Sequence, residues 1–142
     1  MKDLDWSNLS FGYRQTDYNV RCYYRNGKWG EIEVCSDEYL KLHMAATCLH
    51  YGQEAFEGLK AYRCPDGKVR VFRMDENAAR LQSTCRGIMM PEVPTEMFEE
   101  MVKKVVRLNQ EWIPTYESGA TLYIRPLLIG TSAQVGVHPA TE

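Results

Sequence analysis

Hydrophobic and polar positions divide the chain into a strand-rich first half and a helical stretch that follows it. β-Branched and aromatic side chains are frequent over residues 18–25, and a second apolar run covers residues 28–35. Asn26 and Gly27 separate the two runs, and they predict a tight hairpin because both residues tolerate a positive φ. Residues 1–17 show no such pattern and predict an irregular arm.

A second pair of strands is predicted at residues 57–63 and 69–73. Between them lies Pro65-Asp66-Gly67, a turn in which proline presets φ at one position and glycine supplies a positive φ at another. The final strand signal covers residues 120–130. Pro126 in its middle predicts an edge strand or a bulge, because proline donates no hydrogen bond to a neighbouring strand.

Two helices are predicted between these strands, where the apolar period lengthens to about 3.6 residues. We expect Asp75 to be the N-cap of the first helix and Thr95 that of the second. Proline residues end both of them. The apolar face of the first helix comprises Ala78, Leu81, Cys85 and Ile88, and that of the second comprises Met101, Val105, Leu108 and Trp112.

The order of strands, helices and a last strand predicts an α+β fold, with a mainly antiparallel sheet and two helices packed on one of its faces. The expected organisation is an arm at residues 1–17, a small α+β domain at residues 18–130, and a loop at residues 131–142 that lies between domains or at a dimer contact. The loop ends where a further segment is expected, so the chain reads as a piece of a longer protein.

Composition narrows the class of protein. The chain has 142 residues, of which 44% are hydrophobic and 25% charged, as in one ordinary globular domain. A net charge of −2 argues against a nucleic-acid partner, and the longest apolar runs are too short to cross a membrane. The acidic start lacks a secretory signal, and five cysteines without a paired spacing indicate reduced thiols and a cytoplasmic protein. The three histidines form no metal-ligand pattern.

Candidate chemistry is concentrated in residues 49–63, where Gly58 permits close approach of another group to the backbone. Arg80 near a helix start suits a phosphate, although an exposed arginine explains the pattern as well. Tyr123 and Arg125 share one face of the last strand and make a carboxylate-binding pair, or an edge-strand charge that discourages aggregation. An acid–base pair of Glu54 and Glu57 has no further support.

These segments resemble the branched-chain aminotransferases, which are pyridoxal phosphate (PLP) enzymes of fold type IV. The resemblance runs from about Phe11 to the end of the chain. It rests on LHYGQEAFEGLKAYR, VFRMDENAARLQSTCRGIMMP, QEWIP and SGATLYIRPLLIGTSAQVGV, in that order. It implies transfer of the amino group of leucine, isoleucine or valine to 2-oxoglutarate, with PLP as cofactor and glutamate and 2-oxo acids among the substrates and products.

The resemblance also implies roles for single residues. Arg80 binds the PLP phosphate, and Tyr123 and Arg125 receive a substrate carboxylate. Val137 reaches into the pocket of the partner subunit of a homodimer or larger oligomer. The residues that line the substrate pocket are Phe11, Tyr51, Phe56, Gly58 and Tyr123.

No lysine of this chain matches the Schiff-base lysine of the family, which comes from a second domain beyond residue 142. We therefore expect no catalytic residue in the chain, no metal site, and no activity from this N-terminal small domain alone. Two alternatives stay open. One is another fold type IV enzyme, either a D-amino-acid aminotransferase or an aminodeoxychorismate lyase, and the other is a non-catalytic binding or dimerisation module.

Overall fold

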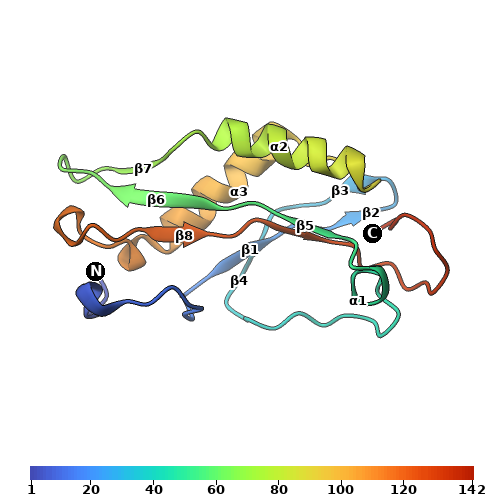
Figure 1. Ribbon diagram of the computed structural model, residues 1–142, viewed down its shortest axis with the longest axis horizontal. Coiled ribbons are helices and arrows are strands. Elements are labelled where there is room, and N and C mark those ends of the chain that lie inside the picture. The colour runs from blue at the N-terminus through green and yellow to red at the C-terminus, as the bar shows by residue number, and fades with distance from the viewer.

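An α+β arrangement of short antiparallel strands and two long helices is formed by residues 1–142, which the computed structural model describes apart from the side chain of Ser7 (Figure 1). The strands are β1 (Asn19–Arg21), β2 (Tyr24–Arg25), β3 (Lys28–Trp29), β4 (Glu33–Cys35), β5 (Glu54–Phe56), β6 (Leu59–Arg63), β7 (Val69–Val71), β8 (Leu122–Ile124) and β9 (Leu127–Ile129). The helices are α1 (Thr47–Tyr51), α2 (Met74–Gly87) and α3 (Thr95–Leu108), with 3-10 turns η1 (Trp6–Asn8), η2 (Gln110–Trp112) and η3 (Tyr116–Ser118). The fold class expected from the sequence is confirmed.

The first hairpin is interrupted by a bulge, which the sequence did not predict. β2 pairs with β3 across the expected turn, in which Asn26 and Gly27 have φ of 53° and 77°. β1 pairs with β4, but the chain between β3 and β4 has one residue more than the chain between β1 and β2. This unpaired residue divides each of the two expected long strands into two short ones.

A long ladder formed by two pairs of strands runs through the centre of the molecule, and β7 pairs with β6 on the other side of β6 from β8. β5 pairs with β9 and β6 pairs with β8, all antiparallel, and the register continues unchanged from one pair to the other. The ladder is interrupted only between Glu57-Gly58 and Arg125-Pro126. There Glu57 N donates to Pro126 O at 2.9 Å, but Pro126 has no N–H with which to return the bond. Pro126 therefore lies between the edge strands β8 and β9, and it creates an interruption at a sheet edge rather than a bulge.

Helices α2 and α3 cover one face of this ladder (Figure 1). Their buried side chains form one core with the strand residues on the helix-covered face. The core consists of Ala55, Leu59, Ala61, Ala78, Leu81, Cys85, Met90, Val93, Phe98, Val102, Val106, Ile113 and Ile124. The α2 face predicted from periodicity is confirmed at Ala78, Leu81 and Cys85, because all three are buried.

The structure corrects the predicted face of α3 and both predicted caps. The buried residues of α3 are Phe98, Val102 and Val106, one position along from the predicted stripe. Asp75 lies in the first turn of α2, after Arg73 at the cap position, and Thr95 is the first residue of α3. The misplaced face of α3 has a physical cause. α3 contacts both α2 and β1, so its apolar surface is broad and the sequence alone does not identify its centre.

Helix α1 was not predicted, because only five residues form it. It ends at Gly52, which adopts a left-handed conformation with φ of 59°. α1 lies beside the C-terminal segment, since Cys48 N donates to Gly130 O at 3.0 Å. The residues after β9 are therefore attached to the domain.

Candidate functional site

The side of the ladder away from α2 and α3 carries the predicted substrate residues, and we call this side the open face. Side chains alternate along a strand, so Phe56 and Gly58 point to the open face while their neighbours point to the helices. The continuing register brings Tyr123 and Arg125 to the same face from the opposite strand. Phe56 remains 61% exposed there, which leaves an aromatic surface available to a ligand.

Arg125 is oriented by the two aromatic rings beside it. Its Nε donates to Tyr123 Oη at 3.0 Å. Its guanidinium carbon lies 4.4 Å from the centre of the Phe56 ring and 5.2 Å from that of Tyr123. Stacking on aromatic faces favours a cation at this place. The hydrogen bonds among the described residues leave both terminal nitrogens of Arg125 without a partner, so the exposed guanidinium can bind a carboxylate with two donors.

Gly58 is required by the close packing of Tyr123. A Cβ atom at residue 58 would lie 2.7 Å from Tyr123 Oη and 3.3 Å from the ring carbon Cε2. Any larger residue would displace the phenol that orients Arg125. The sequence predicted close approach at this glycine, and the approaching group is a side chain of the same domain.

Phe11 joins this group from the N-terminal arm. Its ring lies edge-to-face against Tyr123, with centroids 5.3 Å apart and an interplanar angle of 82°. The structure therefore brings together four of the predicted pocket residues and Arg125, from three separate parts of the chain. The set is Phe11, Phe56, Gly58, Tyr123 and Arg125, which we call the open-face cluster.

Arg80 is on the other side of the ladder and is paired with a buried carboxylate. Its Nε donates to Glu57 Oε1 at 2.8 Å and its Nη2 to Glu57 Oε2 at 2.7 Å. Asn77 Nδ2 donates to the same Oε2 at 2.8 Å. The side chain of Glu57 is only 3% exposed, whereas that of Arg80 is 69% exposed. The hydrogen bonds from Arg80, followed by those from Asn77, lower the pKa of Glu57 below its usual range despite the burial of this carboxyl.

The donor set of Arg80 fits a phosphate group. Two of its nitrogens are used by Glu57, and the third, Nη1, has no partner among the hydrogen bonds of the described residues. The guanidinium thus presents an oriented donor to solvent, and arginine pairs readily with phosphate oxygens.

Sequence reasoning missed the structural importance of Glu57 and Asn77. A signal was present, because Glu57 is in phase with the buried positions Ala55, Leu59 and Ala61. A carboxylate at such a position needs a cation partner. The alternation also separates Glu54 from Glu57, since Glu54 is exposed, which removes the possibility of an acid–base pair between them.

Tyr51 and Val137 belong to a second group, at the C-terminal loop. Tyr51, the last residue of α1, donates its hydroxyl to the carbonyl of Val135. Val135 and Val137 are 65% and 84% exposed. The base of this loop is closed by Ser132, whose Oγ accepts from Thr141 N at 2.7 Å and from Glu142 N at 3.0 Å. We call Tyr51, Val135 and Val137 the loop group.

The contact of substrate or cofactor with any of these residues stays a prediction. Among the described residues, no group of three or more histidine, cysteine, aspartate or glutamate side chains is placed to bind a metal ion. The helices that the structure describes include none with the length and apolar character needed to span a membrane.

Comparison with known proteins shows which proteins the chain is similar to. No protein-family model matches the chain. A branched-chain-amino-acid aminotransferase of Haemophilus influenzae is 51% identical over 142 residues, which are 100% of this chain and 41% of that protein. The chain thus spans about two fifths of the length of this curated relative.

Solved structures agree with the sequence comparison. A branched-chain amino acid aminotransferase of Escherichia coli matches with a TM-score of 0.65 and 28% identity, over 87% of this chain and 35% of that one. A second solved branched-chain amino acid aminotransferase, in complex with N-(5'-phosphopyridoxyl)-L-glutamate, matches with a TM-score of 0.61 and 28% identity, over 88% and 37% of the two chains. The resemblance inferred from the sequence is confirmed by these matches.

Proposed function

Because the chain is homologous over its whole length to branched-chain-amino-acid aminotransferases, we propose that it forms the small domain of a PLP-dependent transaminase. In this proposal the complete protein transfers the amino group of leucine, isoleucine or valine to 2-oxoglutarate. The activity belongs to a protein of the relatives' length, and the lysine that binds the cofactor lies outside residues 1–142. In this proposal the complete protein acts in the metabolism of branched-chain amino acids, including their biosynthesis.

The observation that carries the proposal is the chemistry of the open-face cluster. Both amino-group donors must bind in one pocket, yet glutamate has a second carboxylate and leucine has a branched apolar side chain. Aromatic rings of Phe11, Phe56 and Tyr123 offer apolar surface, and Arg125 offers two unpaired donors at its edge. An apolar pocket with a few placed polar groups suits both substrates.

The cofactor is assigned to Arg80 on this chain. We propose that its exposed Nη1 binds the phosphate, with Glu57 fixing the orientation of the guanidinium. Pyridoxal phosphate, when bound, serves as the electron sink for reaction at the α-carbon of the amino acid. The residues of this chain orient the substrate carboxylate and exclude water from the apolar surface.

The loop group supports a homodimer as the working assembly. Val137 extends from a fastened loop with little contact to its own domain, and such an exposed apolar tip suits the surface of a second copy. Since Tyr51 is bonded to the same loop, it would accompany Val137 to the partner's pocket. Five free thiols fit a reducing, cytoplasmic location.

The test is the substrate discrimination of Arg125→Ala in the complete protein. We expect kcat/KM for glutamate to fall about 10-fold to 100-fold more than kcat/KM for leucine, because only glutamate loses a charged hydrogen bond to its side chain. Arg86→Ala is the matched control, since Arg86 is an exposed arginine of α2 that pairs with Glu92.

Several outcomes would contradict the proposal. Equal losses for both amino acids would remove Arg125 from side-chain recognition. A wild-type protein that prefers D-amino acids, or that releases pyruvate from aminodeoxychorismate, would replace the substrate assignment with one of the related fold type IV activities. If the complete protein showed no PLP-dependent turnover, the function that remains would be that of a non-catalytic binding or dimerisation module.

A further inference from the structure

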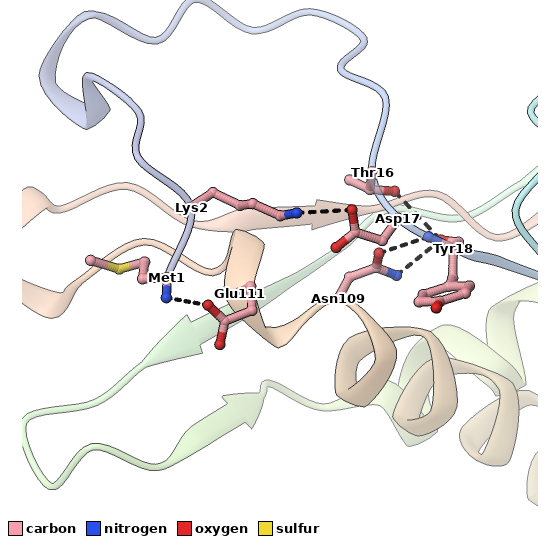
Figure 2. Close-up of polar contacts among 7 residues, drawn as sticks. All are labelled: Met1, Lys2, Thr16, Asp17, Tyr18, Asn109 and Glu111. Carbon is pink, nitrogen blue, oxygen red and sulfur yellow. Dashed lines mark hydrogen bonds and ion pairs between the residues drawn. The ribbon is translucent and has the colours of Figure 1, made fainter.

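The N-terminal arm is a closed loop whose two ends are fastened to the same place, the end of α3 and the η2 turn that follows it (Figure 2). At its start, Lys2 N donates to Glu111 O at 2.8 Å. At its finish, Tyr18 is bonded to Asn109. The residues between these anchors include Phe11, which reaches the open-face cluster.

Asn109 makes the stronger of the two attachments. Its Oδ1 accepts from Tyr18 N at 3.0 Å, and its Nδ2 donates to Tyr18 O at 2.9 Å, so the amide pairs with the backbone as a neighbouring strand would (Figure 2). Nδ2 also donates to Val105 O at 2.8 Å in the last turn of α3. Asn109 is 3% exposed, and these hydrogen bonds are therefore protected from water.

Two ion pairs at the base of the arm, Met1 N with Glu111 and Lys2 with Asp17, are exposed and therefore weaker than the buried hydrogen bonds of Asn109. Lys2 Nζ lies 3.0 Å from Asp17 Oδ1 and 5.0 Å from the centre of the Trp112 ring. Both charged side chains of this pair are 38% exposed, and exposed ion pairs contribute little. Loss of Asn109 would therefore leave the end of the arm without its buried anchor.

Phe11 depends on this anchor because its own surroundings fix it poorly. It is 85% exposed, and among the described residues its ring packs edge-to-face on Tyr123. Burial at residue 11 is too small to order the arm against the entropy of a flexible loop. Tyr13 Oη also donates to Glu38 Oε2 at 2.8 Å, but this bond is exposed, so the buried anchor at Tyr18 has the larger part in placing the Phe11 ring.

We propose that Asn109 is a positioning residue that places Phe11 against Tyr123 by fastening Tyr18, and so sets the affinity of the site for apolar side chains. The inference rests on the proposed function for its effect on substrate. The anchoring itself depends only on the contacts of this chain. Asn109 touches neither the open-face cluster nor Arg80, so any effect on substrate must pass through the arm.

The experiment is a double-mutant cycle in the complete protein with Asn109→Ala, Phe11→Ala and both together. We expect each single change to raise KM for leucine about fivefold while kcat and PLP content stay near the wild-type values. KM for leucine in the double variant should be no higher than in Phe11→Ala, because without the Phe11 ring the arm has no side chain left to place against Tyr123. Asn19→Ala is the matched control, since its amide bonds Asp37 O beside β1 and not the arm.

A second readout needs no catalysis. Trypsin should release the peptide ending at Arg14 faster from Asn109→Ala than from wild type or Asn19→Ala, at equal thermal stability of the three proteins. If Asn109→Ala fails to fold, Asn109→Asp replaces it, because the carboxylate keeps the acceptor for Tyr18 N but loses both donor bonds. Faster release from that variant then supports the anchor.

The outcomes separate the two proposals. The positioning role is overturned if the rise in KM for leucine in the double variant equals the product of the two single rises. It is also overturned if a folded Asn109→Ala protein has an unchanged KM. Equal rates of release overturn the anchor. A wild-type protein without transaminase activity contradicts the proposed function instead, and the release of the peptide then decides the anchor alone.

Discussion

Glu57 and Gly58 are adjacent residues with opposite requirements. Glu57 points to the helix-covered face and needs the charge of Arg80, because a buried carboxylate without a partner is costly. Gly58 points to the open face and must have no side chain, because Tyr123 Oη occupies that space. In the proposed enzyme, Glu57 orients Arg80, which binds the phosphate, and Gly58 lies beneath the substrate pocket. These two residues are neighbours in the chain.

The pH dependence of stability should report on Glu57. The pKa of Glu57 is lowered in the folded chain, so its contribution is complete above the unfolded value of about 4.3 and is lost as pH falls through the lower folded value. Glu57→Gln should reduce the free energy of unfolding by about 1 kcal/mol at pH 7, a value discounted because Arg80 is mostly exposed. Urea unfolding at pH 7 and at pH 3 measures the difference between wild type and variant.

Glu54→Gln is the control for this experiment, because Glu54 lies three residues away in β5 and is exposed. Its effect should be within about 0.5 kcal/mol at either pH. A stability loss in Glu57→Gln that is the same at both pH values would show that the carboxylate charge is not what the pair contributes.

At the scale of elements, the sequence predicted what local chemistry determines. The Asn26-Gly27 and Pro65-Asp66-Gly67 turns and both long helices are confirmed, because each depends on residues within one short segment. The pairing of β5 with β9 could not be predicted, since no local signal specifies a partner so distant in the chain. The face of α3 was misplaced for a related reason, because contact with β1 determines which of its apolar residues are buried.

The residues of the candidate site likewise fall into those that a local pattern predicts and those that depend on partners distant in the chain. Strand alternation alone placed Tyr123 and Arg125 on one face, and in the structure Arg125 Nε donates to Tyr123 Oη. Arg80 was noticed for its place in a helix, but its partner Glu57 was not, because the residues that join β5 to β6 meet α2 only in the folded domain. The attachment of Tyr51 to Val135 likewise depends on how the C-terminal loop packs on α1.

Gly58→Ala tests how tightly the two opposite strands of the central ladder pack on the open face. The added methyl would meet Tyr123 Oη at 2.7 Å, so the ring must move and the bond from Arg125 Nε must lengthen or break. We expect a loss of about 1–3 kcal/mol in the free energy of unfolding, as overpacking usually causes. Thermal and urea unfolding measure this loss. Gly87→Ala is the matched control, since a Cβ there meets nothing within 4 Å, and its expected change is neutral or stabilising.

At the scale of the whole molecule, two segments extend from the domain and both are fastened at their bases. The arm is fastened by Asn109 and Glu111, and the C-terminal loop by Ser132 and Gln53, whose Oε1 accepts from Ala140 N at 3.0 Å. Each presents an exposed apolar side chain, Phe11 or Val137, at a distance from its base. The domain therefore has two preformed projections, one toward its own open face and one, in our proposal, toward a partner.

Val137→Asp should weaken that partner contact. A carboxylate placed against an apolar pocket is costly to desolvate, so we expect KM for leucine to rise or the dimer to dissociate at about tenfold higher protein concentration, with PLP still bound. Sedimentation velocity and leucine kinetics on the complete protein measure both effects. Val34→Asp on β4 is the control, because Val34 is an exposed valine of another element. An unchanged dimer with unchanged kinetics would mean that the loop does not reach a neighbouring subunit.

The central ladder also governs how the domain reaches its folded state. Its paired residues are between 61 and 75 positions apart along the chain, and both long helices lie in the intervening segment. Closing so long a loop costs entropy before any pairing energy is recovered, and high contact order slows folding. We therefore expect α2 and α3 to dock on each other first, so that their packing brings the two distant strands within reach. Substitutions in the Phe98, Val102 and Val106 face of α3 would then slow the folding rate itself, while those in β9 would mainly accelerate unfolding.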